Sequence, residues 1–399
     1  MDIPQGYKQT ELGVIPTDWQ LQSVGEYCTV KARIGWQGLR SDEYLTFGEY
    51  GLITSTDIVD GSINWGTCYF VSKTRYLQDS NIIVQEDDTL ISKDGTIGKV
   101  GIVQNMPFPS TLNSGVFVIR PKFDSIYKRY LGCIFKSIFF QDFISRLTAG
   151  STIVHLYQKD IVNFIYPVPT LVEQRAIAEA LSDIDGLIAA LDRKIAKKRL
   201  IKQGAMQQLL TGKKRLPGFI DPWVEKKLGA ISHIKTGSCN GDQAVENGKY
   251  PFFVRSQKVY AIDSYSYDGE AILVPGEGGI GNIFHYINGK FDYHQRVYKI
   301  SDFADDVCGK YIFFYMSRYF GEYALSLTVK ATVDSLRLPT FEEFVICLPM
   351  DIKEQQAIAA ILSDMDKEIV DLEAKRDKYY LLKSGMMQKL LTGKIRLKY

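Results

Sequence analysis

Two stretches of this sequence decide the architecture, and they are nearly the same stretch. Residues 173–216 are EQRAIAEALSDIDGLIAALDRKIAKKRLIKQGAMQQLLTGKKRL, and residues 354–397 are EQQAIAAILSDMDKEIVDLEAKRDKYYLLKSGMMQKLLTGKIRL. They align without a gap, and more than half of the positions are identical. Chance does not produce such a match, so the chain is a tandem duplication with a period of about 181 residues.

Each copy predicts one long helix. Thr170 and Glu173 have the spacing of a capping box, and Asp351 and Glu354 repeat this spacing in the second copy. A glycine follows each LLT segment and fits a helix end. A helix of about 40 residues would be a rod of roughly 60 Å, because each residue adds about 1.5 Å.

Apolar residues in each copy follow alternating steps of four and three, which is the heptad pattern of a coiled coil. Such a seam needs a partner, and the economical partner is the other copy. We expect antiparallel pairing, because it would place the two globular parts at opposite ends; the alternative is that each helix packs only on its own domain. The residues expected to pair are Ile177, Leu181, Ile184, Ile188, Leu191 and Ile195 in the first copy and Ile358, Leu362, Met365, Ile369 and Leu372 in the second.

The repeat also predicts the domain organisation. Neither globular part shows a regular βαβ pattern, so we expect two α+β domains, each with a twisted, partly antiparallel sheet, separated by the two long helices. The predicted parts are a globular domain at residues 1–169, a helix at 170–212, a second globular domain at 213–350 and a second helix at 351–399.

The two globular domains resemble each other faintly. LISKDGTIGKVGIV at 90–103 matches ILVPGEGGIGNIFHYI at 272–287, and both predict a strand, a glycine turn and a second strand. Residues 276–281 formally match the dinucleotide-binding pattern GxGxxG, but such a site needs a helix after the glycines, and a strand pattern follows here. We therefore expect a hairpin and no cofactor. Amphipathic helices are expected at 127–147 and 309–327.

Composition limits the class of protein. The chain has 399 residues, 45% of them hydrophobic and 24% charged, and its net charge is only +2, so any basic surface must be local. The six cysteines form no CxxC pair and no ligand cluster with the four histidines, so we expect no metal site and reduced, mostly buried thiols in a cytoplasmic protein. We also expect no signal peptide and no membrane span.

Catalytic motifs are missing from the sequence. It contains no P-loop, no amino-methyltransferase tetrapeptide, no HExxH and no GxSxG. Across a whole duplicated chain, this favours a binding protein without catalytic residues over an enzyme.

Positive charge gathers in the later part of the first helix. The run is compatible with a solvated helix face, with phosphate contacts or with an acidic partner protein. Its members are Arg193, Lys194, Lys197, Lys198, Arg199 and Lys202.

Polar loops in the globular domains are better candidates for reading DNA. Arg, Lys, Gln and Asn pair with base edges, and Ser and Thr suit phosphates, although ordinary loops use the same residue types. The candidates in the first domain are Lys93, Asp94, Thr96, Lys99, Asn113, Ser114, Ser151, Thr152, Tyr157, Gln158 and Lys159, with His155 in the same run. The candidates in the second domain are His294, Gln295, Arg296, Lys330, Thr332, Ser335 and Arg337, with Asp334 among them.

Two divergent domains that alternate with two near-identical helices resemble the specificity subunit of type I restriction-modification systems. The most specific segments are EQRAIAEALSDID and EQQAIAAILSDMD, followed by QQLLTGKKRL and QKLLTGKIRL, and GTIGKVGIV, GSTIVHLYQKD and DGEAILVPGEGG resemble segments of target recognition domains. The resemblance implies a non-catalytic subunit whose two domains each read one half of a bipartite, asymmetric site in double-stranded DNA. It implies that the helices set the spacer and dock two modification subunits, which restriction subunits would join. S-adenosylmethionine, ATP and Mg would belong to those partners.

Two other functions stay open from the sequence alone. An enzyme with an unrecognised nuclease or methyltransferase site would methylate DNA as a purified chain. A coiled-coil scaffold that binds only protein would show no sequence-specific binding of duplex DNA.

Overall fold

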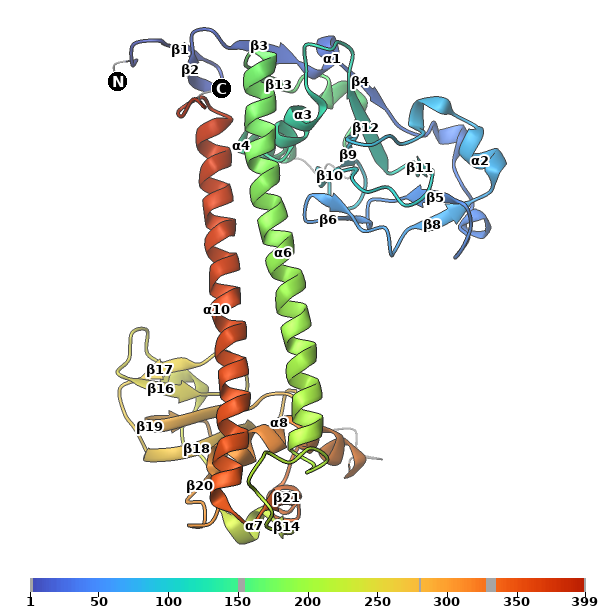
Figure 1. The fold of residues 1–399 in the computed structure, drawn as a ribbon. Helices are drawn as coiled ribbons and strands as arrows, with labels where there is room; N and C mark the ends of the chain where they lie inside the picture. Colours follow the sequence, from blue (N-terminus) through green and yellow to red (C-terminus); the bar gives the residue numbers. More distant parts are fainter. Residues whose placement is uncertain (1–2, 150–154, 280, 328–334, 398–399) are drawn as a thin grey trace. The chain divides into compact units, whose positions relative to one another are not determined.

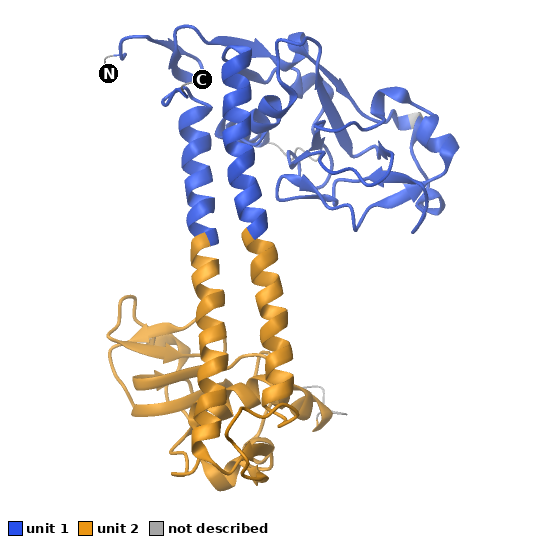
Figure 2. Cartoon of the chain, in the orientation of Figure 1, with its two compact units in different colours: residues 1–190, 376–399 blue, residues 191–375 orange. Residues whose placement is uncertain are grey.

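The computed structural model describes residues 3–149, 155–279, 281–327 and 335–397, which form two compact units (Figures 1 and 2). Unit 1 contains residues 1–190 and 376–399, and unit 2 contains residues 191–375. Each long helix therefore begins in one unit and ends in the other.

The two long helices are α6 (Leu171–Leu209) and α10 (Ile352–Leu390), each continuous over 39 residues (Figure 1). The second helix ends at Leu390, before the boundary drawn at residue 399, and Gly393, the glycine expected at the helix end, adopts the left-handed region with a φ of 69°. The first helix likewise ends before residue 212, where Gly212 has a φ of 67°. These glycines lie in the turns that follow the helices.

Unit 1 is built around a six-stranded sheet with the order β4-β12-β9-β10-β7-β6. Its strand pairs are antiparallel except for β10 and β7, which are parallel. Three smaller sheets have the orders β11-β5-β8, β13-β3 and β1-β2. The strands are β1 (Tyr7–Thr10), β2 (Gly13–Pro16), β3 (Gln20–Ser23), β4 (Cys28–Lys31), β5 (Tyr50–Ile53), β6 (Ile58–Val59), β7 (Ser62–Ile63), β8 (Tyr69–Val71), β9 (Thr89–Ser92), β10 (Val100–Ile102), β11 (Ser110–Leu112), β12 (Val116–Pro121) and β13 (Ile165–Val168).

The described part of unit 1 contains short helices, two of them where a single helix was predicted. Residues 127–147 do not form one helix, because Ser137 is extended with a ψ of 169° and separates α3 from α4. Its hydroxyl donates to the carbonyl of Ile134 at 2.6 Å. The helices are α1 (Val24–Tyr27), α2 (Lys73–Leu77), α3 (Lys128–Phe135), α4 (Ile138–Thr148) and α5 (Gln158–Ile161), with 3-10 turns at Gly35–Gln37, Ser41–Glu43 and Ser80–Ile82.

Unit 2 repeats this plan. Its main sheet has the order β15-β20-β18-β19-β16-β17, again with one parallel pair, β16 and β19, and a separate pair joins β14 to β21. The strands are β14 (Trp223–Lys227), β15 (His233–Thr236), β16 (Tyr250–Phe253), β17 (Tyr260–Ile262), β18 (Tyr267–Pro275), β19 (His285–Tyr293), β20 (Val297–Ser301) and β21 (Val345–Pro349). The helices are α7 (Leu228–Ile231), α8 (Gly309–Leu327) and α9 (Leu338–Glu342), with a 3-10 turn at Gly241–Gln243.

The two sheets match position by position, with one difference at the outer hairpin. In unit 1 the second strand of that hairpin, β7, joins the sheet, whereas in unit 2 the first strand, β16, joins it. The α+β prediction is therefore confirmed. The glycine segments also form hairpins as predicted, because β9 pairs antiparallel with β10 and β18 with β19.

Within each unit, segments of the two long helices run antiparallel. In unit 1, Asp185 pairs with Lys383 at 2.5 Å, and the earlier Glu173 pairs with the later Arg396. In unit 2 the same order holds, because Lys198 pairs with Glu368 while the later Lys202 pairs with the earlier Asp366.

The seam residues lie mostly at buried positions. Ile177 and Leu181 belong to the core of unit 1, which contains both strand residues and the end of α10 at Leu390 and Leu391. Each helix start therefore packs on its own globular part and on the other helix, so neither sequence alternative describes it alone. The buried members are Ile177, Leu181, Ile184, Ile188, Ile195, Ile358, Leu362 and Ile369, and Leu191, Met365 and Leu372 are partly exposed.

A glutamate, an arginine and a tryptophan form a junction in each unit. In unit 1, the buried carboxylate of Glu173 accepts hydrogen bonds from Trp19 Nε1 at 3.1 Å and from Arg396 Nε at 2.5 Å. In unit 2, Glu354 accepts from Arg215 Nε and Nη2, both at 2.7 Å. Each arginine follows the helix that starts in the other unit, so within each unit the start of one long helix is bound to the segment after the other.

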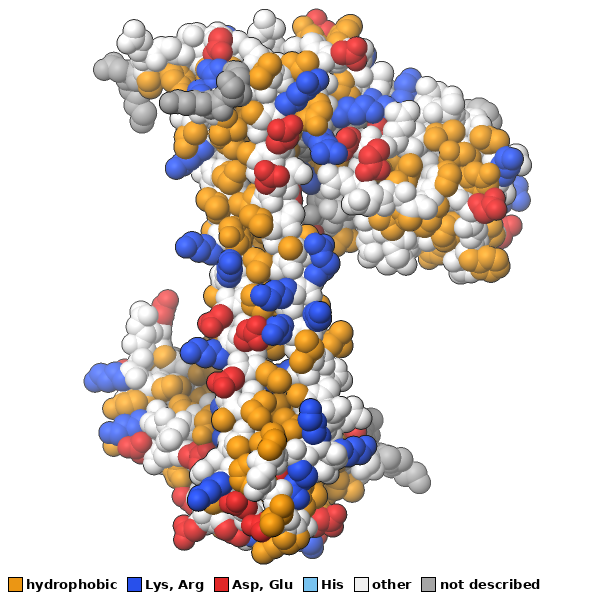
Figure 3. All heavy atoms as spheres, in the orientation of Figure 1, with side chains coloured by type: hydrophobic (Ala, Val, Ile, Leu, Met, Phe, Trp, Pro, Cys, Tyr) orange, Lys and Arg blue, Asp and Glu red, His pale blue; other side chains and the backbone are white. Residues whose placement is uncertain are grey.

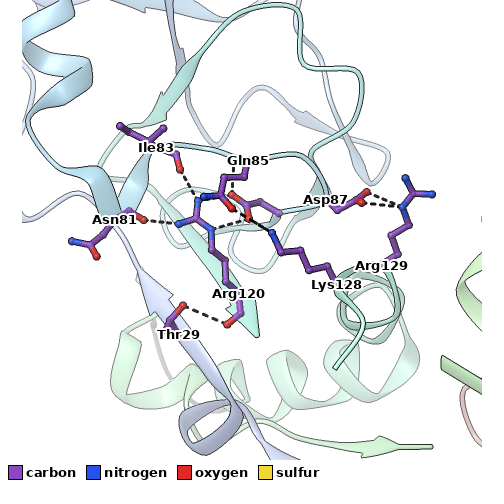
Figure 4. A network of polar contacts seen from close by, with 9 residues as sticks. Thr29, Asn81, Ile83, Gln85, Asp87, Arg120, Lys128 and Arg129 are labelled. Atoms are coloured by element: carbon purple, nitrogen blue, oxygen red, sulfur yellow. Dashed lines mark hydrogen bonds and ion pairs between the residues drawn. The ribbon is translucent and has the colours of Figure 1, made fainter. Parts of the chain in front are cut away.

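A buried ion pair secures the strand that leads to the glycine hairpin of unit 1 (Figure 4). Arg120 on β12 donates from Nε and Nη2 to the fully buried carboxylate of Asp88, at 2.8 and 2.5 Å. The same guanidinium also donates to the carbonyls of Asn81 and Ile83. Asp88 directly precedes β9, so this network ties the start of β9 to the end of β12.

Candidate nucleic-acid interface

The loop between β9 and β10 in unit 1 is held by backbone hydrogen bonds to two other segments. Lys93 N donates to Gly115 O, and Leu156 N donates to Lys93 O, both at 2.9 Å. Asp94 also forms an isolated antiparallel bridge with His155. Three segments that are distant in the sequence, around residues 94, 114 and 156, therefore meet at one place.

Polar side chains converge at this place. His155 Nδ1 lies 2.6 Å from Asp94 Oδ1, and the His155 ring contacts Tyr157 edge-on. Asn113 Nδ2 donates to Tyr44 Oη at 3.0 Å. Asp94 and Asn113 are half-buried while His155 is exposed, so the cluster has an exposed side chain that a ligand can reach.

The loop between β18 and β19 in unit 2 is held in the same way. Leu336 N donates to Gly276 O at 2.7 Å, and Glu277 forms an antiparallel bridge with Ser335. Gly276 N donates in turn to Arg296 O at 2.8 Å. The positions of Lys93, Asp94 and His155 in unit 1 thus correspond to those of Gly276, Glu277 and Ser335 in unit 2.

The side chains at the second place are different and more basic. Glu277 lies between two arginines, with Arg255 Nη1 at 3.2 Å and Arg296 Nη1 at 3.6 Å from its carboxylate oxygens. Gln295 Nε2 donates to Asn240 Oδ1 at 2.7 Å. Arginine, glutamine and asparagine can all form paired hydrogen bonds with base edges.

The histidine beside these arginines is neutral in character. Burial lowers the pKa of His294, and the nearby charges of Arg255 and Arg296 lower it further. His294 Nδ1 accepts a hydrogen bond from the backbone N–H of Arg296 at 2.9 Å, which requires this nitrogen to be unprotonated. His294 therefore fixes the backbone at Arg296, and it is 7% exposed, so it offers little surface to a ligand.

The predicted reader residues divide into groups. The structure brings together Lys93, Asp94, Asn113, Ser114 and Tyr157 in unit 1 and Gln295, Arg296 and Ser335 in unit 2. Thr96 and Lys99 are exposed on the loop after Asp94, Gln158 and Lys159 are exposed on α5, and Arg337 is exposed before α9. Ser151, Thr152, Lys330, Thr332 and Asp334 lie outside the described residues.

Sequence reasoning missed four residues of these clusters. Tyr44, Asn240, Arg255 and Glu277 lie on segments whose positions are set by strand pairing. Only Glu277 had a local signal, because the alignment of the two glycine segments places it opposite Asp94.

The basic run on α6 has a partner inside unit 2. Lys198, Arg199 and Lys202 form ion pairs with Glu368, Glu373 and Asp366 of α10. Arg193, Lys194 and Lys197 are exposed. Half of the run therefore lies opposite acidic side chains of α10, a pairing that the sequence did not indicate.

The described part of the chain offers no metal site, since it contains no group of three or more His, Cys, Asp or Glu residues that could hold an ion. All six cysteines are free, but the prediction that most are buried was wrong, because only Cys28 and Cys68 are buried. Burial raises the pKa of the Cys28 thiol to about 11.

Of the helices that the structure describes, none combines the length and apolar content needed to cross a membrane.

Comparisons with known proteins agree with the duplicated plan. The family model described as type I restriction modification DNA specificity domain matches residues 16–198 and 220–378. The type I restriction enzyme MjaVIII specificity subunit of Methanocaldococcus jannaschii is 25% identical and is aligned over 96% of this chain and 94% of its own length.

Two solved structures are similar in fold. The S subunit of a type I restriction-modification system from M. genitalium has a TM-score of 0.68 at 14% identity, covering 98% of both chains. A chain from a structure describing complex assembly and conformational transition of a type I R-M system has a TM-score of 0.56 at 17% identity, covering 96% of this chain and 99% of that one.

Proposed function

Because this chain belongs to the type I restriction-modification DNA specificity family, we propose that it is the DNA-reading subunit of such a system, in which each unit contacts one half of a bipartite site in double-stranded DNA. One observation carries this proposal: the two glycine-loop clusters have equivalent backbone frames and different side chains. Two equivalent backbone arrangements that carry different side chains suit a DNA site whose two halves differ in sequence.

The side chains of the two clusters that could contact DNA fall into those suited to base edges and those suited to phosphates. In unit 1, Lys93 can address base edges, and in unit 2 Arg255, Arg296 and Gln295 can do so, since lysine and arginine pair with guanine and glutamine with adenine. The exposed lysines on the loop and on α5 suit phosphates, which position a protein on DNA without reading sequence.

The helices suit two further tasks, spacing and docking. A helix of 39 residues is about 58 Å long, and one turn of DNA is about 34–36 Å, so α6 and α10 are long enough to fix the unread spacer. Inserting a few residues between Ala189 and Ala190 should lengthen the spacer and leave both half-sites intact. An unchanged spacer would contradict this role.

The helices also carry matching exposed faces at equivalent repeat positions. Leu200 and Leu381 are 68% and 76% exposed, and hydrophobic and basic side chains share the helix surface (Figure 3). Gly204 and Gly385 lie one turn further on, where a Cβ would meet no described atom within 4 Å. A helical glycine costs about 1 kcal/mol relative to alanine, so close approach of a partner helix is a better reason than packing within this chain.

Two equivalent faces favour two identical partners, and we assign them to two modification subunits. These would supply S-adenosylmethionine-dependent methylation, and restriction subunits with ATP and Mg would join them, all acting in the cytoplasm. The described residues of this chain then supply recognition, spacing and docking.

The test is to map methylated motifs in cells with and without this gene. We expect one bipartite motif to disappear with the gene and to return with the complete chain. Methylation by the purified chain alone would instead indicate an enzyme. Binding of modification subunits without any sequence-specific binding of duplex DNA would indicate a protein scaffold.

A further inference from the structure

Each glycine loop carries one carboxylate at the same position. Asp94 directly precedes Gly95, whose φ is 71°, and Glu277 directly precedes Gly278, whose φ is 73°. Surfaces that bind DNA are strongly positive, because phosphates repel acids. An acid at the centre of both clusters therefore needs a reason.

The carboxylates contact the cationic or titratable side chains of their clusters. Asp94 lies 2.6 Å from His155, and Glu277 lies within 3.6 Å of both Arg255 and Arg296. Each arginine faces Glu277 through Nη1, which leaves Nη2 and Nε of the guanidinium for other acceptors.

These contacts are not what holds the loops in place. The side chains of Asp94 and Glu277 are 38% and 31% exposed, and exposed ion pairs add little stability. The loops are fixed by backbone hydrogen bonds from Leu156 and Leu336, which do not involve the carboxylates. Removing either negative charge should therefore leave the fold intact.

We propose that Asp94 and Glu277 are positioning residues for base recognition. Each carboxylate holds a flexible donor side chain in one orientation, so that the free edge of that side chain meets a base and not the nearest phosphate. Asp94 acts on His155 in one half-site, and Glu277 acts on Arg255 and Arg296 in the other. This inference rests on the proposed function and gives a physical reason why each unit would discriminate between base pairs.

The experiment uses the complete chain expressed with its modification subunits, with methylated motifs mapped for wild type and variants. Glu277→Gln should relax discrimination at one or two base pairs of one half-site by about 5- to 100-fold, the effect of losing a good base contact. Asp94→Asn should relax only the other half-site, so each variant is the control for the other. Glu343→Gln, which removes a surface ion pair with Lys227, should change neither half.

Two additional measurements separate positioning from other roles. Arg296→Lys or Arg255→Lys should relax the same base pairs as Glu277→Gln, and Glu277→Asp should restore discrimination in part. Binding of the Glu277→Gln complex to unrelated duplex DNA should stay equal or rise, because a negative charge has been removed.

The outcomes that overturn the inference are distinct from those that overturn the proposed function. A normal bipartite motif in both carboxylate variants would overturn the inference alone. So would relaxation at base pairs that neither arginine variant affects, since Glu277 would then read a base itself, or a loss of thermal stability that accompanies the relaxed motif. Absence of any bipartite motif with the wild-type chain would overturn the proposed function.

Discussion

The two helix junctions use the same repeated residues but are completed differently by the globular parts. In unit 1, Glu173 accepts from Trp19 and Arg396, and Arg396 also binds the carboxylate of Asp18. In unit 2, Arg215 binds the carboxylate of Glu354 and the backbone carbonyl of Asp221.

The tryptophans differ as well. Trp223 lies beside Arg215, with the guanidinium 5.8 Å from its ring, yet its buried Nε1 has no hydrogen-bond partner among the described residues. The duplicated helices and the segments that follow them supply the glutamate and the arginine of each pair. The segment at the start of each globular part supplies the further hydrogen-bond partners, which are Trp19 and Asp18 in unit 1 and the backbone of Asp221 in unit 2. We therefore expect that breaking the junction lowers the free energy of unfolding more in unit 1 than in unit 2.

The largest expected effect is at Arg396. Arg396→Ala leaves the buried Glu173 carboxylate with the Trp19 indole as its remaining side-chain donor, which should lower the free energy of unfolding of unit 1 by about 3 kcal/mol. Urea unfolding, with hydrogen exchange at β3 and β13 to locate the loss, measures it. Lys394→Ala, an exposed residue of the same tail, is the control, and equal effects of the two variants would contradict the interpretation.

A smaller effect should separate the two tryptophans. Trp19→Phe and Trp223→Phe both remove an indole N–H and some ring volume, but only Trp19 donates to a carboxylate. Because a hydrogen bond to a charged group contributes about 1.5–3 kcal/mol, Trp19→Phe should destabilise its unit by about 2 kcal/mol more than Trp223→Phe. Similar losses in the two variants would show that the hydrogen bond contributes little.

The sequence was sufficient for the features that depend on local pattern. The heptad seam predicted two long helices, and glycine-flanked strands predicted both hairpins, because period and turn chemistry act over a few residues. The break at Ser137 was not predictable in this way, since FKSIFF contains no glycine or proline and the helix pattern continues through it. Tertiary packing overrides local preference there.

The residues of the candidate sites were also predictable only where they depend on local sequence pattern. Loop residues such as Asp94 and Arg296 were found because they lie in short polar loops between predicted strands. Arg255 and Tyr44 were missed because only strand pairing brings them to the clusters. The ion pairs of Lys198 and Lys202 were also missed, since assigning a partner to a basic helix face requires the register of the other helix.

A third comparison concerns pH, because burial lowers the pKa of both His285 and His294 in unit 2 below the usual 6.5. Below that pH the unfolded chain takes up protons that the folded unit resists. The stabilising contribution is therefore complete above pH 6.5 and is lost as pH falls. Thermal unfolding between about pH 7.5 and about pH 5.5 should show this loss, and replacing both histidines by glutamine should reduce it. An equal loss of stability in the wild type and in the double variant would contradict the assignment to these two histidines.

The smallest expected effect concerns two glycines at equivalent positions of α6 and α10, where substitutions in the two units should have the same result. Gly204→Ala and Gly385→Ala should each stabilise the chain by about 0.5–1 kcal/mol, because alanine favours helix and the added Cβ meets no described atom within 4 Å. If these glycines let a partner helix approach, the same variants should weaken binding of modification subunits, which a titration of purified subunits measures. Gly186→Ala is the matched control, because its Cβ also meets open space while Lys367 stands at its repeat position. It should stabilise α6 without changing docking, and identical docking by all three variants would show that the glycine faces are ordinary solvent-exposed helix.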